Sequence, residues 1–216
     1  MGLQGLKTVF QYGLTVLGIS IALMSCSTKK SVVPYYNTPD FTPFWLTNVP
    51  DTLHTISAFS LTDQRGMPVS DKTVNNKIYI ANFFFTKCPS ICPKMMKHIK
   101  MLADSFRDNS NIAFLSFSVT PELDSVPQLH KYAELKHIND ERWHLLTGNK
   151  SEIYSLARKS FFAEGDIGFN ADSSEFLHTE HILLVDRNKH LRGVYNGTVL
   201  LDIEKLKEDI RELLKE

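Results

Sequence analysis

The stretch Ile78–Met96 constrains what this chain can fold into more than any other part of its sequence. It starts as an apolar run, residues 78–85, rich in β-branched and aromatic side chains, which predicts a strand buried on both faces. Two cysteines follow, Cys88 and Cys92, and Pro93 then suits the first residue of a helix with Cys92 at its cap. Both sulfurs would lie near unpaired N–H groups at the positive end of that helix, which lowers a thiol pKa and favours the reactive thiolate.

The first 26 residues are typical of a targeting segment rather than of a folded domain. Lys7 supplies a positive start, residues 8–25 are largely apolar, and the stretch ends in a Ser-Cys pair whose cysteine is Cys26. This ending resembles the lipobox of bacterial lipoproteins, in which cleavage precedes a cysteine that carries lipid. A plain membrane anchor and an ordinary secretory signal are the alternatives. We expect a signal peptide over residues 1–25, lipidation of Cys26, and a membrane-anchored protein facing the periplasm or the cell exterior.

The remaining chain predicts a short tether and one domain. Residues 26–53 contain four prolines among Ser, Thr and Asn and show no helical or strand period, which is typical of a linker, although the aromatic residues Phe41, Phe44 and Trp45 should pack against the domain. Residues 54–216 alternate strand and helix patterns. The predicted strands cover residues 56–61, 68–69, 78–85, 112–119, 143–146, 180–186 and 191–195, and the predicted helices 93–107, 126–135, 152–162 and 201–214.

The order of these elements is that of an α/β thioredoxin-like fold: a central mixed sheet flanked by helices, with an N-terminal β-hairpin turning at residues 63–66. Crossovers between parallel strands are right-handed, so the cysteine loop should lie at the carboxyl end of its strand. The chain carries 24 Lys and Arg against 24 Asp and Glu, with no basic run, and we therefore expect no nucleic-acid partner.

The cysteine pair indicates soft-metal or redox chemistry. With Cys26 lipidated, Cys88 and Cys92 are the two cysteines left, and in an oxidising compartment they can form either a disulfide or a metal site. Two thiolates suit Cu(I) above other metals but usually recruit a third ligand. Among eight histidines His178 is the best candidate, because it precedes a predicted core strand whose starting loop should lie beside the cysteine loop.

These residues resemble the Sco/SenC family of copper-binding, thioredoxin-like proteins, which are implicated in assembling the copper A centre of cytochrome oxidase. The family's Cys-x-x-x-Cys-Pro stands here at residues 88–93 after a Phe-rich strand, and its distant histidine, commonly followed by Ser or Thr, matches His178-Thr179. The resemblance covers roughly residues 55–215. It implies that Cys88, Cys92 and His178 bind copper, as Cu(I), Cu(II) or both, and that the partner is an oxidase copper-bearing subunit or another copper chaperone.

Two positions depart from the family's pattern. Leu177 stands where an Asp usually precedes the histidine, and residues 119–124 read Val-Thr-Pro-Glu-Leu-Asp where the family usually has Val-Asp-Pro-Glu-Arg-Asp. Neither departure removes a ligand. Loss of neighbouring carboxylates can alter the orientation and basicity of a histidine ligand, or a partner surface.

Other interpretations remain beside the copper chaperone. As a redox pair, Cys88 and Cys92 would serve an extracytoplasmic thiol–disulfide oxidoreductase or redox sensor. Two features count against this interpretation: thioredoxins have two residues between their cysteines, where this chain has three. They also have a cis-proline in the loop opposite the cysteines, and the His178 loop contains no proline. A structural disulfide would close too short a loop to stabilise much. We expect a chaperone rather than an enzyme with turnover. We also expect His181 to be an ordinary strand residue and at least one of Met95 and Met96 to be core. His98, His130, His137 and His190 fall on predicted helix surfaces or turns and carry no functional signal.

Overall fold

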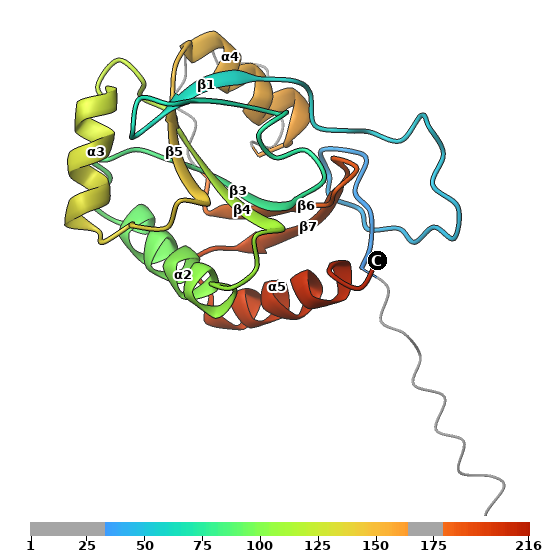
Figure 1. Cartoon of the computed structure of the whole chain (residues 1–216). Coiled ribbons are helices and arrows are strands. Elements are labelled where there is room, and N and C mark those ends of the chain that lie inside the picture. Colours follow the sequence, from blue (N-terminus) through green and yellow to red (C-terminus); the bar gives the residue numbers. More distant parts are fainter. Residues whose placement is uncertain (1–32, 164–178) are drawn as a thin grey trace, which may run out of the picture. The chain divides into compact units, whose positions relative to one another are not determined.

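The computed structural model describes residues 33–163 and 179–216, which fold as one mixed sheet with helices on both faces (Figure 1). The strands are β1 (Ser60–Asp63), β2 (Pro68–Ser70), β3 (Ile78–Phe84), β4 (Ile112–Ser118), β5 (Trp143–Thr147), β6 (His181–Val185) and β7 (Leu191–Asn196). The helices are α2 (Ile91–Ser105), α3 (Val126–Leu135), α4 (Lys150–Ser155), the π-helical turn η1 (Leu156–Ser160) and α5 (Leu200–Leu213).

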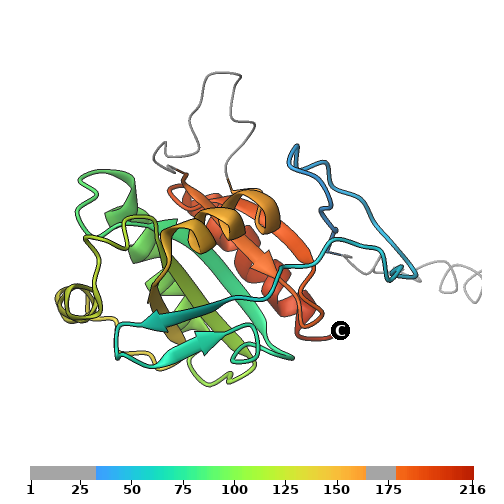
Figure 2. The ribbon, with the colours of Figure 1, turned by 90° about the horizontal axis from the view of Figure 1, so that it is seen from above.

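The sheet runs in the order β2-β1-β5-β4-β3-β6-β7, with β3, β4 and β5 parallel and the other neighbours antiparallel. Alternate residues of β3 face opposite sides, because side chains alternate along a strand. Ile80 and Phe84 join a core with α2, α3 and α5, whereas Tyr79 and Phe83 join a second core with α4 and η1. Figure 1 shows α2 and α5 on one side of the sheet and α4 on the other, and in Figure 2 α4 lies over the face nearest the viewer.

The pairing of β3 with β6 decides what lies beside the cysteine loop. The two strands are antiparallel, and Asn82 near the end of β3 pairs with Ile182, the second residue of β6. The chain therefore starts β6 at the same edge of the sheet at which β3 ends and delivers the cysteines. The start of β6 therefore lies beside the end of β3, as expected, while the loop with His178 that precedes β6 lies outside the described residues.

A buried polar chain crosses the centre of the sheet. The indole Nε1 of Trp143 donates to Ser116 Oγ at 3.0 Å, and that hydroxyl donates to Asn82 Oδ1 at 2.6 Å. The amide of Asn82 then reaches Met96 Sδ at 3.8 Å. A buried polar group costs free energy unless it is hydrogen-bonded, so these partners explain how polar residues fit in strands that are otherwise apolar.

The opposite, amino end of β3 is closed by a buried arginine. Arg192 is 2% exposed, and its guanidinium donates to the carbonyl oxygens of Val33 (2.8 Å) and Pro34 (3.1 Å). It also pairs with Asp186 Oδ2 at 2.9 Å and with Glu216 Oε2 at 3.0 Å. This Arg192 cluster joins the first described residues, the end of β6 and the end of the chain.

The predicted fold class is confirmed, and most predicted elements lie within two residues of the observed ones. Two differ more. The first hairpin strand begins at Ser60 rather than Ile56, whose N–H bonds Lys189 O instead of a neighbouring strand. The predicted helix over residues 152–162 begins at Lys150, where Asn149 accepts the N–H of Glu152, and turns π-helical from Leu156.

One aromatic residue of the predicted tether, Phe41, contacts the domain as expected, and a second, Phe44, contacts Tyr35 within the same segment. Phe41 lies edge-on to His181 with 5.5 Å between ring centroids, and Phe44 lies 6.3 Å from Tyr35. Trp45 is 60% exposed. The predicted signal peptide and the lipidation site Cys26 lie outside the described residues, and within these no helix is long and apolar enough to span a membrane.

Candidate metal centre

The two cysteines lie in the turn between β3 and α2 and at the first turn of α2. The N–H of Cys88 donates to Phe85 O at 3.2 Å, closing the turn that follows the strand. Helix α2 begins at Ile91, so Cys92 is its second residue and not its cap, which corrects our prediction. The proline at 93 fits because a helix leaves the N–H groups of its whole first turn unpaired, so a missing N–H costs nothing there.

The thiols have opposite acidities although both lie at the start of one helix. Burial raises the pKa of Cys88, but hydrogen bonds from the Cys92 thiol and from the N–H groups of Cys92, Ser90 and Ile91 outweigh it and leave that pKa below its ordinary value. Burial, together with the hydrogen bond given to Cys88, raises the pKa of Cys92 to about 12. The expectation that the helix end lowers both pKa values is therefore wrong for Cys92.

Both thiols are free and nearly covered. Cys88 is 7% exposed and Cys92 is 3% exposed, and no disulfide joins them. Cys88 is thus the thiolate-forming group of the pair, and Cys92 is the proton donor beside it. A dithiol of this kind can bind a soft cation, which displaces the remaining proton, or attack a disulfide through Cys88.

A buried carboxylate, Asp124, holds the start of the cysteine loop. It is 1% exposed and accepts hydrogen bonds from Thr86 through the backbone N–H (3.1 Å) and the hydroxyl (2.5 Å). It also accepts from the hydroxyls of Ser118 (2.6 Å) and Thr120 (3.2 Å) at the end of β4. Our sequence reasoning did not single out Asp124, although it closes the Thr-Pro-Glu-Leu-Asp segment after a buried strand, and that position was the available signal.

The comparisons with known proteins agree on one family. The family model described as SCO1/SenC matches residues 48–215. The chain belongs to the SCO1/SenC family.

Three solved structures of this family resemble the chain. A SCO1/SenC family lipoprotein from Bacillus anthracis str. Ames is 26% identical, covers 74% of this chain and 95% of its own, and has a TM-score of 0.65. BsSco, a member of the Sco family of cytochrome c oxidase assembly proteins, is 28% identical, covers 75% and 94%, and has a TM-score of 0.64. Copper-bound ScoI of Bradyrhizobium japonicum is 25% identical, covers 74% and 99%, and has a TM-score of 0.58.

In this SCO1/SenC chain, the predicted third ligand, His178, lies outside the described residues. Within the described residues, no group of three or more His, Cys, Asp or Glu side chains is placed to hold a metal. His181 is the first residue of β6, and it packs on Phe41, on the side of the sheet away from Cys92, so its predicted place on a strand face is confirmed. Its Nδ1 atom is buried without a partner among the described residues.

Two further side chains of α2 bear on the site. Met95 and Met96 are both buried in the core, as expected. His98, expected on a helix surface, is instead 7% exposed, and its Nδ1 lies 2.8 Å from Gly197 O. The N–H of Gly197 in turn donates to Glu180 O at 2.8 Å, so α2, the start of α5 and the segment before β6 are joined at one point.

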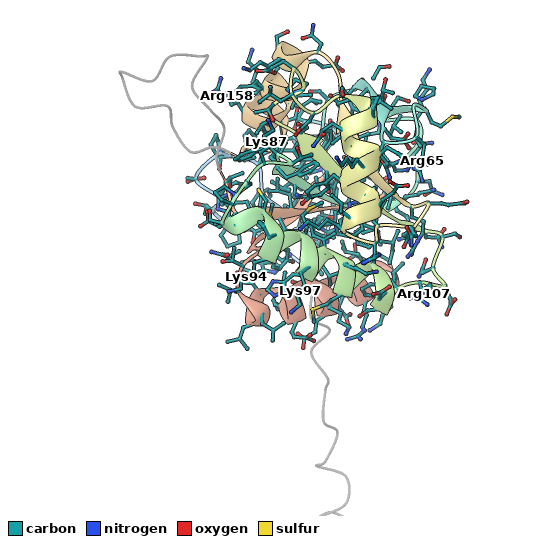
Figure 3. All side chains as sticks on the ribbon, turned by 90° about the vertical axis from the view of Figure 1, so that its left-hand side faces the viewer. Arg65, Lys87, Lys94, Lys97, Arg107 and Arg158 are labelled. Carbon is teal, nitrogen blue, oxygen red and sulfur yellow. The ribbon has the colours of Figure 1, made fainter. Side chains whose placement is uncertain are left out.

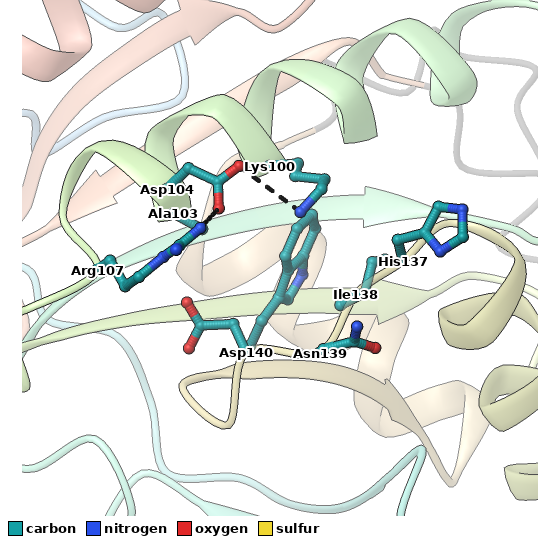
Figure 4. A pocket seen from close by; sticks show the side chains of 9 residues that line it. Lys100, Ala103, Asp104, Arg107, His137, Ile138, Asn139 and Asp140 are labelled. Atoms are coloured by element: carbon teal, nitrogen blue, oxygen red, sulfur yellow. Dashed lines mark hydrogen bonds and ion pairs between the residues drawn. The ribbon is translucent and has the colours of Figure 1, made fainter.

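A pocket of about 330 Å³ opens at the other end of α2, between that helix and the segment leading into β5 (Figure 4). Its charges are largely matched within the protein. Asp104 pairs with Lys100 (3.6 Å) and with Arg107 (2.8 Å), and Asp140 pairs with Arg142. It contains neither cysteine, and we assign it no part in the chemistry of the thiols.

Proposed function

We propose that the protein is a copper metallochaperone, anchored outside the cytoplasm through lipid on Cys26, that delivers copper to the copper A site of a cytochrome c oxidase. The observation that carries the proposal is the pair of free thiols Cys88 and Cys92 at the end of β3. The pKa of Cys88 is lowered, and both thiols belong to the buried apolar core. Two sulfurs in an apolar setting favour Cu(I), and the cargo leaves when stronger ligands replace them.

His178 completes the proposed copper site. The support is topological: Thr179 follows it directly, and β6 begins at His181 beside the end of β3. The family membership adds the match of His178-Thr179 to the family's distant histidine. Copper-bound ScoI and the oxidase-assembly protein BsSco support the cargo and the client, and the B. anthracis lipoprotein supports the anchor.

A copper titration tests the proposal. The reduced chain should bind one Cu(I), and oxidation to the Cys88–Cys92 disulfide should abolish this binding, because a disulfide offers no thiolate. The variant His178→Ala should hold Cu(I) more weakly and lose far more affinity for Cu(II), which prefers imidazole nitrogen beside sulfur. His181→Ala is the matched control. Equal loss in the two variants, or stoichiometric binding by the oxidised protein, would contradict the assignment.

A second function, thiol–disulfide exchange, is favoured by the difference between the two thiols, since the pKa of Cys88 is lowered and that of Cys92 is raised. The Cys88 thiolate would attack a client disulfide and release one client thiol, and Cys92, after losing its proton, would attack the mixed disulfide. The client leaves as a dithiol, and Cys88–Cys92 becomes a disulfide that an external dithiol protein must reduce again. His178→Ala separates the two functions, because it should weaken copper binding and leave the rate of exchange with a model disulfide unchanged.

A further inference from the structure

The described segment that contains the two thiols, from the end of β3 through most of α2, carries charge of one sign. Between Thr86 and Ala103 the sequence has four lysines and no Asp or Glu. Lys100 pairs with Asp104, but Lys87, Lys94 and Lys97 are exposed, and none of these three ammonium groups makes an ion pair or hydrogen bond within the described residues. Figure 3 shows the three lysines on one face of the molecule.

One of these lysines, Lys94, is placed against the preference of its own helix. The first turn of α2 contains Lys94 and no acidic residue, although the N-terminus of a helix carries partial positive charge and favours Asp or Glu. Elsewhere in the described chain many cations are matched, as Lys189 is by Asp71 at 2.7 Å and Lys150 by Glu122 at 3.0 Å. An unpaired cation at the positive end of a helix does not stabilise that helix, and a partner with acidic side chains would match Lys94 together with its neighbours Lys87 and Lys97.

We propose that Lys87, Lys94 and Lys97 form a docking surface for the acidic face of a protein that exchanges copper with Cys88 and Cys92. The proposal rests on the copper function proposed above. Lys87 immediately precedes Cys88, and Lys94 follows Cys92 by two residues, so a protein that covers the lysines also covers the thiols. Opposite charge raises the encounter rate and fixes the register in which the partner's ligands meet the sulfurs.

A protein partner fits this surface better than an anionic membrane does. The described chain begins at Val33, which contacts Arg192 at the amino end of β3, whereas the lysines surround its carboxyl end. The seven residues of β3 separate the two ends by roughly 20 Å at about 3.3 Å per residue. A lipid surface against the lysines would also bury the thiols without offering a ligand that can take or give copper.

The first experiment measures the electrostatic field at Cys88 without copper. The full chain in nonionic detergent is alkylated with anionic iodoacetate and with neutral iodoacetamide, and the ratio of the two rates cancels changes in the thiolate fraction. In Lys87→Glu/Lys94→Glu/Lys97→Glu the ratio should fall several-fold at low salt, and the corresponding Gln variant should lie between. The control Lys72→Glu/Lys77→Glu, which changes charges before β3, should leave the ratio unchanged. An unchanged ratio in the Glu variant would overturn the proposal.

The second experiment measures transfer to a soluble copper A domain with an acidic surface, and to the same domain with those carboxylates changed to amides. The Glu variant should load Cu(I) like the wild type but transfer it about tenfold more slowly at low salt, within the range of electrostatic steering. With the copper A domain whose carboxylates are changed to amides, the Glu variant and the wild type should transfer Cu(I) at the same rate. Equal rates to the acidic domain would overturn the docking surface, whereas failure of the wild type to load copper would overturn the proposed function instead.

The membrane alternative is tested on the full chain in vesicles with and without phosphatidylglycerol. If the protein partner is the occupant, the anionic lipid should not slow alkylation of Cys88. Protection by phosphatidylglycerol that disappears in the Glu variant would show that lipid covers the lysines, and would overturn the proposal.

Discussion

The two ends of β3 handle charge in opposite ways. At the amino end Arg192 is 2% exposed, contacts two carboxylates and two backbone carbonyls, and lies 3.9 Å from the ring centre of Tyr35. At the carboxyl end a thiolate-forming cysteine lies in a segment with three exposed lysines, Lys87, Lys94 and Lys97, that make no ion pair with any described residue. The charge of Arg192 at the amino end is matched within the protein and contributes to stability, whereas the three lysines at the carboxyl end are left for the partner proposed above.

The largest change in the free energy of unfolding should come from a substitution at the amino end of β3. Arg192→Met leaves Asp186 buried without its cation, and removing one partner of a buried pair costs about 3–5 kcal/mol in the free energy of unfolding. Urea unfolding measures the loss. The control Lys215→Met removes a surface pair with Glu212 and should cost less than about 1 kcal/mol. A loss at Arg192 no larger than at Lys215 would remove the contrast between the two ends.

Substitution of Asp124 should cause the next largest loss of stability, because this buried side chain accepts hydrogen bonds from Thr86, Ser118 and Thr120 beside the cysteine loop. In Asp124→Ala the hydroxyls of Ser118 and Thr120 and the N–H of Thr86 lose their acceptor, and an unsatisfied buried group costs about 1–3 kcal/mol. We expect a loss of about 2–3 kcal/mol together with faster alkylation of the loosened Cys92. Asp124→Asn, which keeps one acceptor oxygen, should lose less. Unchanged alkylation in Asp124→Ala would separate this carboxylate from the thiol loop.

Gly197→Ala tests the point where α2 meets the segment before β6. An added Cβ would lie 2.7 Å from Met95 Cγ and 3.0 Å from the backbone oxygen of Glu180, which cannot move freely. Overpacking of this kind costs about 1–3 kcal/mol, and the shift of α2 should change the alkylation rate of Cys88. Gly66→Ala is the control: its φ of +76° strains an alanine, but the site is open and distant from the thiols, so Cys88 should react normally.

The smallest effect is a change in how the alkylation rate of Cys88 depends on pH. Because the pKa of Cys88 is lowered in the folded protein, its alkylation rate should fall only as the pH drops through a value below about 8.5, the pKa of a free cysteine. Cys92→Ala removes a donated hydrogen bond, so the pKa of Cys88 should rise and the rate at pH 7 should fall several-fold. Cys92→Ser, which keeps an O–H donor, should stay close to the wild type. Identical pH profiles for all three proteins would exclude the hydrogen bond as a cause.

Much of the fold could be predicted from the sequence because it depends on burial. The run Ile78–Phe85 has no polar interruption but Asn82, and a strand covered on both faces is the way a chain accommodates it. The bounds of α3 were predicted as observed, since Ser125 and Pro127 mark its start clearly. The neighbourhood of the end of β3 and the start of β6 followed from the predicted order of the strands.

The finer features of the site could not be predicted, because they depend on contacts distant in sequence. The raised pKa of Cys92 follows from its burial one position inside α2, and a pattern that places Pro93 first in the helix misses this. His98 is polar, and its neighbours in the sequence are exposed lysines, so a surface position was expected. It is buried because its ring pairs with the carbonyl oxygen of Gly197 in the loop before α5. The roles of His178 and Cys26 stay predictions, since both lie outside the described residues.

The order of the strands also bears on how the protein behaves in a crowded compartment. A sheet with an open outer strand is a template for strands of other chains, which leads to aggregation. Here one outer strand, β2, has three residues and begins with Pro68, which has no N–H to donate. Along the other, β7, the N–H of Tyr36 already bonds Leu191 O at 3.0 Å, and the buried Arg192 fixes the neighbouring backbone. Both margins of the sheet therefore offer few free backbone groups to an added strand, which should limit aggregation of the folded protein.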